Sequence, residues 1–177
     1  MPVIPKPRPA LPAGIPGIRS QGTALAGFLG LSALAWVLAS VPIILNSSGW
    51  YATSLKAPWM PPSWLFRTTW MVLYVGVAAA AWLVWRKGGM TRGTLAGYAV
   101  QLLLNTAWPV TFFALYPLLG DVALWAAFAV ICALTATLAF LILRFGPVDA
   151  AAGYLVLPYF SWLLFSASLN LYSAIHN

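Results

Sequence analysis

Five long apolar stretches, separated by short polar or proline-containing connectors, dominate the chain. About 20 helical residues, rising 1.5 Å each, cross a hydrocarbon core of about 30 Å. The pattern therefore predicts membrane-spanning helices over residues 22–45, 63–85, 94–116, 121–144 and 149–175. Because the connectors leave no room for a separate soluble domain, we expect an all-α, polytopic membrane protein whose residues 22–177 form a bundle of five transmembrane helices.

The composition agrees with this prediction. Of the 177 residues, 62% are hydrophobic and only 6% are charged. Soluble globular domains are about one quarter charged, since charged side chains must cover their surface. A chain with so few charges is expected to be a multi-pass integral membrane protein.

The first twenty residues contain six prolines, which prevent a helix from propagating. We expect residues 1–21 to form a flexible arm, and the prolines interrupt the apolar core that a cleavable signal peptide needs.

Most basic residues fall in this arm and in two connectors, while Lys56 and Arg67 lie on the opposite side. By the positive-inside rule, the N-terminus is cytoplasmic, and we expect a bacterial membrane. Dispersed basic residues do not indicate a nucleic-acid partner.

The residue types needed for most enzymatic chemistry are scarce. The single histidine, His176, and the single cysteine, Cys132, provide neither a metal site nor a catalytic triad. Cys132 has apolar neighbours, and we expect it to be buried and inert. The only acids, Asp121 and Asp149, begin predicted helices, where a carboxylate caps free backbone N–H groups. No ionisable residue falls in the middle of a span, so an ion-coupled pump is disfavoured.

Polar and aromatic residues follow one face of the third span. Gln101, Asn105 and Trp108 recur at helical spacing, and Pro109 obliges the helix to kink. A side-chain amide within a membrane must face a partner, so Asn105 points inward. It either joins helices or meets a ligand, and on its own the first interpretation is favoured.

The fifth span carries a similar stripe after Pro158. Trp162, Ser166, Leu169 and Asn170 share one helix face. A tryptophan within a span is unusual, because its N–H prefers the membrane interface. Trp162 belongs either to a packed core or to a cavity wall, and the spacing alone favours the core.

The second span adds a third stripe, formed by Phe66, Trp70, Tyr74 and Val77. Three inward stripes that carry aromatic rings can enclose a flat, apolar ligand. The stripes alone thus leave two interpretations open for the space between the second, third and fifth spans, a packed core or a ligand cavity.

Three segments of the chain resemble the TspO/MBR family of tryptophan-rich sensory proteins, translocator proteins and peripheral-type benzodiazepine receptors. They occur in the order of that family and extend the resemblance over roughly residues 25–177. The segments are WYATSLKAPWMPPSW (50–64) with Trp70, Leu73 and Tyr74, then QLLLNTAWP (101–109) with Phe112 and Phe113, and PYFSW (158–162) with Leu169 and Asn170.

The resemblance implies a five-helix bundle, commonly a homodimer, that binds porphyrins such as protoporphyrin IX under a lid formed by the first connector. The resemblance implies that the protein requires no resident cofactor, since the porphyrin is its ligand. Carried over to this chain, the family pattern and the stripes above predict these ligand-binding residues: Tyr51, Phe66, Trp70, Asn105, Trp108, Trp162, Ser166, Leu169 and Asn170. We therefore expect a receptor or sensor for porphyrins and related flat ligands, with a regulatory role.

Two alternatives stay open at this point. The resemblance also allows light-dependent degradation of bound porphyrin, with Trp70 and Trp162 as electron donors, and it allows transport of porphyrin or lipid. Membrane lipids are expected partners, but Tyr172 is not followed by the Lys or Arg that completes a proposed sterol motif, so specific cholesterol binding is expected to be weak or absent. Gly93 and Gly97 are spaced as in helix-dimer motifs and are a weak dimer signal.

Overall fold

The computed structural model describes residues 17–177, and this part of the chain is all-helical, without a strand. The elements are α1 (Ile18–Asn46), α2 (Trp50–Thr53), α3 (Ser63–Arg86), α4 (Arg92–Pro109), the π-helical segment η1 (Val110–Ala114), α5 (Tyr116–Leu119), α6 (Asp121–Phe145) and α7 (Ala150–His176).

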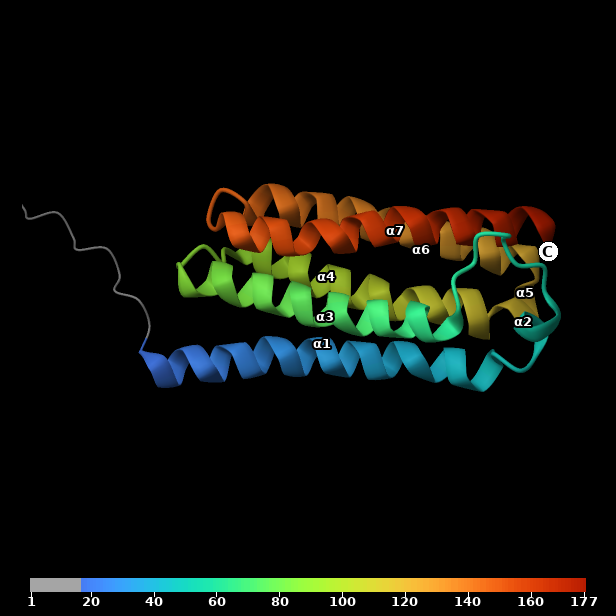
Figure 1. Ribbon diagram of the computed structural model, residues 1–177, viewed down its shortest axis with the longest axis horizontal. Helices are drawn as coiled ribbons and strands as arrows, with labels where there is room; N and C mark the ends of the chain where they lie inside the picture. The colour runs from blue at the N-terminus through green and yellow to red at the C-terminus, as the bar shows by residue number, and fades with distance from the viewer. Residues whose placement is uncertain (1–16) are drawn as a thin grey trace, which may run out of the picture.

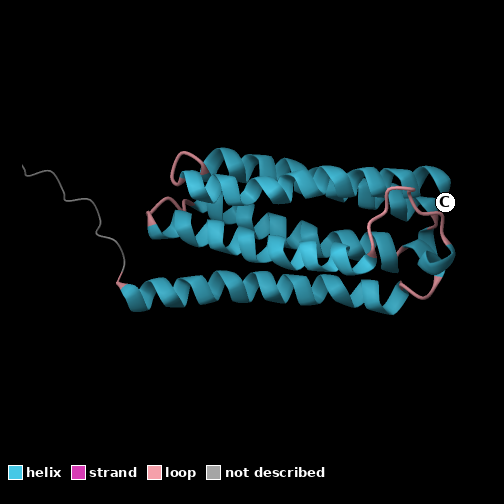
Figure 2. Ribbon diagram, viewed as in Figure 1, coloured by secondary structure: helices cyan, strands magenta, loops and turns pink. Residues whose placement is uncertain are grey.

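The long helices form a bundle in which α1 and the α6–α7 pair lie on opposite sides of α3 and α4 (Figure 1). The helix α1 contacts α3, α4 and η1, whereas α6 contacts α4 and packs most extensively against α7. The short helix α2 and the loop after it cross the end of the bundle where the C-terminus lies (Figure 2). We call residues 50–62, which include α2, the lid.

The predicted N-terminal arm is partly wrong. Residues 1–16 lie outside the described part of the chain, but residues 18–21, assigned to the arm, already belong to α1. The last proline of the arm is Pro16, and no helix-breaking residue follows it until Pro42. The helix therefore starts four residues before the predicted residue 22.

Four of the described helices, α1, α3, α6 and α7, are long and apolar enough to cross a membrane. The predicted third span, 94–116, instead divides into α4, η1 and part of α5. Pro109 has no N–H to donate to the Asn105 carbonyl, and the chain passes into a wider turn in which the N–H of Leu115 donates to Val110 O at 3.0 Å. The structure thus supports four spans, and the count of five stays a prediction.

The two connectors at the end opposite the lid are joined to each other. Asp149 caps α7, accepting hydrogen bonds from the N–H groups of Ala151 (2.9 Å) and Ala152 (3.2 Å), as the sequence predicts. Its other carboxylate oxygen lies 3.0 Å from Lys87 Nζ in the connector between α3 and α4. These contacts and the Lys87 charge hold the pKa of Asp149 below its ordinary value, against the opposing effect of burial.

Two sequence interpretations of small residues change in the structure. Cys132 is exposed rather than buried, because the inward positions of α6 are taken by Ile131 and Leu134. A Cβ atom on Gly97 would lie 2.8 Å from Phe140 Cε1, so this glycine permits close packing of α4 on α6 within the chain. The homodimer stays a prediction that Gly97 no longer specifically supports.

Candidate functional site

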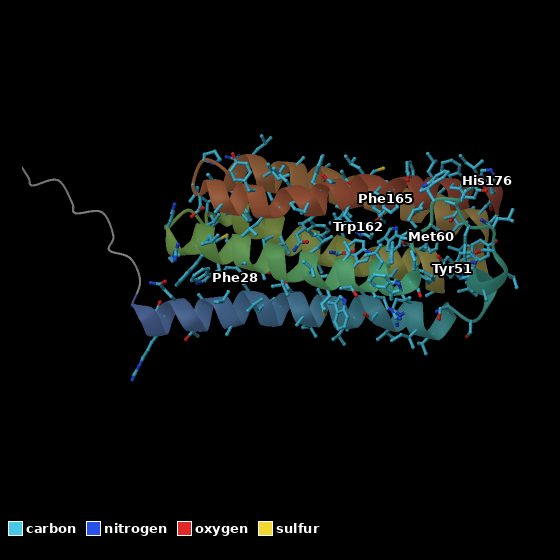
Figure 3. All side chains as sticks on the ribbon, viewed as in Figure 1. Phe28, Tyr51, Met60, Trp162, Phe165 and His176 are labelled. Carbon is cyan, nitrogen blue, oxygen red and sulfur yellow. The ribbon has the colours of Figure 1, made fainter. Side chains whose placement is uncertain are left out.

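A cavity of about 750 Å³ lies at the lid end of the bundle, between the second half of α1 and the helices α3, α4, η1 and α7. Its size falls within the range of about 300–1,000 Å³ that is typical of small-molecule sites. Tyr51 and Met60 of the lid contribute to its lining and lie near the C-terminal end of the bundle (Figure 3).

The structure brings all but one of the predicted ligand-binding residues to this cavity. The lining includes Tyr51, Phe66, Trp70, Asn105, Trp108, Ser166, Leu169 and Asn170. Trp162, labelled in Figure 3, is the exception, since it does not belong to the lining. It shares the helix face of Ser166, but its ring packs against Phe66, with centroids 5.6 Å apart, and Phe66 in turn packs against Trp70.

Three rings of the cavity lining form a layered stack. The centroids of Trp70 and Trp108 are 6.4 Å apart with their planes inclined by 22°, and those of Trp108 and Phe112 are 5.4 Å apart at 27°. Tyr159 closes the back of Trp70 edge-on, at 5.8 Å and 82°. Nearly parallel rings present π-faces on which another planar ring can stack.

Hydrogen bonds hold two of these side chains in place. The Trp108 indole Nε1 donates to Asn170 Oδ1 at 2.9 Å, and Asn170 Nδ2 donates to the carbonyl of Leu124 at 3.0 Å. The Asn105 amide donates to the Tyr159 hydroxyl. Both amides therefore join helices, which was the favoured interpretation of Asn105 from sequence, and they also border the cavity.

Three buried polar atoms of the cavity wall have no hydrogen-bond partner within residues 17–177. They are Trp70 Nε1, the Tyr74 hydroxyl and Ser166 Oγ. Buried polar groups are nearly always paired, and an unpaired one costs about 1–3 kcal/mol. The residues of the wall thus hold one indole N–H and two hydroxyls that no other described residue pairs.

The lid is anchored by Trp50. In a regular α-helix the carbonyl of Phe113 would accept from residue 117, but this residue is Pro117, which has no N–H. The Trp50 indole Nε1 supplies the missing donor at 3.1 Å, and its ring stacks on Tyr116 with centroids 3.7 Å apart. The proline therefore creates the acceptor to which the lid attaches.

Tyr51, the next residue of the lid, faces the cavity. Its ring packs edge-on against Phe113, with centroids 4.9 Å apart. Burial raises the pKa of the Tyr51 hydroxyl above its ordinary value. The group is therefore neutral at physiological pH and adds no negative charge to the site.

The far end of the lid is held by α7 and the residue that follows it. The Asn177 side chain accepts from the N–H of Leu55 at 2.7 Å and donates to the carbonyl of the same residue at 3.1 Å. Trp59 Nε1 donates to Ser168 Oγ at 3.2 Å. The lid is thus fastened on both sides of the cavity.

Comparison with known proteins extends over most of these elements. The sequence profile of the TspO/MBR family matches residues 24–175. The chain belongs to the TspO/MBR family. The translocator protein of Ovis aries is 34% identical over 125 residues, 68% of this chain and 70% of that protein.

Bacterial relatives in the TspO/MBR family are similarly close. The tryptophan-rich protein TspO of Chlorobaculum tepidum is 34% identical over 131 residues, covering 70% of this chain and 77% of its own. The tryptophan-rich sensory protein of Cereibacter sphaeroides is 32% identical over 143 residues, which cover 81% of this chain and 86% of that protein. The four long apolar helices and the membership of the TspO/MBR family agree on a membrane protein.

Sequence reasoning missed the part of the site that α1 supplies. Trp36, Ser40, Ile43 and Ser47 recur at helical spacing and line the cavity. The helix is apolar on every face, which hides the inward stripe, but a tryptophan and a serine one turn apart within the span were an available signal. Within residues 17–177, no group of three or more His, Cys, Asp or Glu residues could hold a metal ion.

Proposed function

We propose that this protein is a membrane receptor that binds porphyrins and related flat, apolar ligands in the aromatic cavity beneath the lid. The observation that carries the proposal is the layered stack of Trp70, Trp108 and Phe112 in a cavity of about 750 Å³. A tetrapyrrole is broad, planar and rich in π-electrons, so stacking and apolar burial supply its affinity. A regulatory role agrees with the name of its sensory relative.

The proposal includes a membrane arrangement. We propose that α4, η1 and α5 together make the fifth crossing, because residues 92–119 are helical apart from Leu115 and lie between α3 and α6. At 1.5 Å per residue, a segment of this length reaches about 40 Å. The connector with Lys87 and the end of α6 with Arg144 then face the cytoplasm, and the lid faces the opposite side.

A porphyrin titration tests the function. Protoporphyrin IX is added to purified protein, and binding is followed by quenching of tryptophan fluorescence and by porphyrin absorbance. We expect saturable binding, weakened about tenfold or more by Trp108→Ala and by Trp36→Ala, since each removes a cavity ring. Trp125→Ala is the matched control, because this ring is exposed on α6 and does not line the cavity. Folded variants that bind as tightly as the unmodified protein would contradict the proposal.

Light-dependent porphyrin degradation is a second candidate, favoured by the position of Trp70. Its ring lines the cavity and its Nε1 has no partner in the described chain, whereas Trp162 packs against Phe66 and does not belong to the lining. Under illumination in the presence of dioxygen, Trp70→Phe is expected to slow porphyrin loss more than Trp162→Phe. Equal rates in both variants and in the unmodified protein, with intact binding, would exclude tryptophan-mediated degradation.

A further inference from the structure

Arg67 is a cation at the edge of the cavity without an anionic partner among the described residues. It lies in the second turn of α3, on the stripe of Ser63, Trp70 and Tyr74, and lines the cavity with them. Its side chain is exposed, and the single ion pair found within residues 17–177 joins two other residues. The guanidinium is therefore available to a molecule in the cavity.

Lys56 brings a second positive charge to the same cavity. Its Nζ donates to the carbonyls of Tyr51 at 2.6 Å and Ser54 at 3.1 Å, and it lies 4.6 Å from the centroid of the Tyr51 ring. These contacts hold the turn of the lid together and use the ammonium donors. Its charge still adds to the potential of the cavity that it lines.

The two acidic side chains of the chain do not neutralise these cations. Asp149 is paired with Lys87, at the end of the bundle opposite the lid. Asp121 begins α6, accepts a hydrogen bond from the N–H of Val122, and does not line the cavity. A cavity with apolar walls, two cations and no acid attracts anions, because a low local dielectric strengthens the field of a fixed charge.

We propose that the cavity selects flat, apolar ligands that carry a carboxylate, and that the Arg67 guanidinium binds this carboxylate while the ring stacks between α1 and α3. The proposal rests on the proposed function, since the ring must first enter the cavity. A planar guanidinium with its fork of N–H donors suits the two oxygens of a carboxylate. The acid group would lie at the exposed edge of the site, with the apolar ring against Trp70.

Comparison of protoporphyrin IX with its dimethyl ester tests this selection, because the ester keeps the ring and loses both charges. Affinities are measured in a neutral detergent for the unmodified protein, Arg67→Gln and Arg67→Lys. Arg86→Gln is the matched control, since Arg86 lies at the other end of α3, over the Trp82 ring and away from the cavity. The ratio of the two affinities within each variant removes differences in how the porphyrins partition into detergent.

We expect the unmodified protein and Arg86→Gln to bind the diacid about tenfold or more tightly than the ester. Arg67→Gln is expected to reduce this ratio to about twofold, and Arg67→Lys to restore part of it. An unchanged ratio in Arg67→Gln would overturn the inference while leaving porphyrin binding intact. Failure of both porphyrins to bind the unmodified protein would instead refute the proposed function.

Lipid phosphate offers the same anionic oxygens as a carboxylate, and a second arm separates the two sources. The titrations are repeated in nanodiscs of phosphatidylcholine with and without phosphatidylglycerol. A preference for the diacid that persists in both membranes and depends on Arg67 supports the inference. Equal binding of diacid and ester in both membranes, with Arg67→Gln weakening only phosphatidylglycerol binding, would assign Arg67 to a lipid phosphate and overturn it.

Discussion

The α6–α7 pair and the α1 side of the bundle are built from similarly apolar sequence but pack in different ways. In α6, Leu124, Ile131 and Leu138 are completely buried. On α1, buried side chains are few, and Leu31, Val37 and Leu38 are about half exposed. Close packing fills the space between α6 and α7, whereas the cavity lies between the second half of α1 and its neighbours.

The two halves of α1 also differ from each other. In the first half, the Tyr98 hydroxyl donates to the carbonyl of Phe28 at 3.1 Å and shares a hydrogen bond of 3.0 Å with Ser32 Oγ, while Trp82 Nε1 donates to the carbonyl of Gln21 at 3.0 Å. The second half carries the cavity-lining residues. The helix α1 is therefore attached to α3 and α4 along its first half, and its second half borders the cavity.

The largest effect is expected at the tight contact between Gly153 of α7 and Gly146, the residue that follows α6. A Cβ atom on Gly153 would lie 3.0 Å from the Cα of Gly146, and this backbone cannot move aside as a flexible side chain can. Gly153→Ala is therefore expected to destabilise the protein by about 1–3 kcal/mol, measured by thermal unfolding in detergent. The same substitution at Gly30 of α1, where no atom lies within 4 Å, is the control and is expected to be tolerated. Equal losses at both positions would contradict the contrast between the two sides.

The next largest effect is expected at Trp50, which anchors the lid. Trp50→Phe keeps a ring against Tyr116 but removes the donor to the carbonyl of Phe113, which Pro117 cannot replace. The unpaired carbonyl is expected to cost about 1–3 kcal/mol and to speed porphyrin release. Release rates by stopped-flow fluorescence check this, with Trp64→Phe as control because Trp64 is exposed on α3 and does not line the cavity. Unchanged release from Trp50→Phe would show that the indole does not hold the lid.

A smaller effect is expected at the fixed half of α1. Tyr98→Phe keeps the edge-on contact with Phe28, 5.4 Å between centroids, and removes the two hydroxyl contacts. We expect a loss of about 1 kcal/mol and faster hydrogen exchange in residues 21–32. If exchange rises equally throughout α6, then α1 is not attached as a separate unit.

The smallest effect concerns pH at the end opposite the lid. Asp149 has a lowered pKa in the folded protein, so the unfolded chain binds its proton first as the pH falls. Its contribution to stability is fully present above about pH 4 and is lost below it. Asp149→Asn keeps an oxygen for the capping hydrogen bonds and removes the ion pair, so its unfolding temperature should depend less on pH between about 5 and 3. An identical pH dependence in both proteins would show that another group is responsible.

The sequence predicted the helices well because apolar length alone fixes them. The predicted 121–144 is α6 (Asp121–Phe145), and 63–85 is α3 (Ser63–Arg86). The third span was harder, since Pro109 was expected to kink a helix but its spacing does not show the π-helical turn that follows. Within that turn the carbonyl of Phe113 accepts from the Trp50 indole, a contact between residues 63 positions apart that spacing along the chain does not show.

The candidate site was predictable where polar or aromatic residues interrupt an apolar span, as at Trp70 and Asn105. The contribution of α1 was not predicted, because a helix that is apolar on all faces gives no preferred direction. Trp162 shares the helix face of Ser166, which lines the cavity, but its own ring packs against Phe66 of another helix and does not belong to the lining. Which ring reaches the cavity depends on packing across helices, and periodicity along one helix does not carry that information.

Fluorine NMR of protein labelled with 5-fluorotryptophan tests the central claim most directly, because a bound porphyrin ring current moves nearby signals strongly. The ten tryptophan signals are assigned by single Trp→Phe substitutions. On addition of protoporphyrin IX, the signals of Trp36, Trp70 and Trp108 are predicted to move, while those of the exposed Trp64 and Trp125 stay in place. Movement of Trp64 and Trp125 with the three cavity signals unchanged would contradict the account.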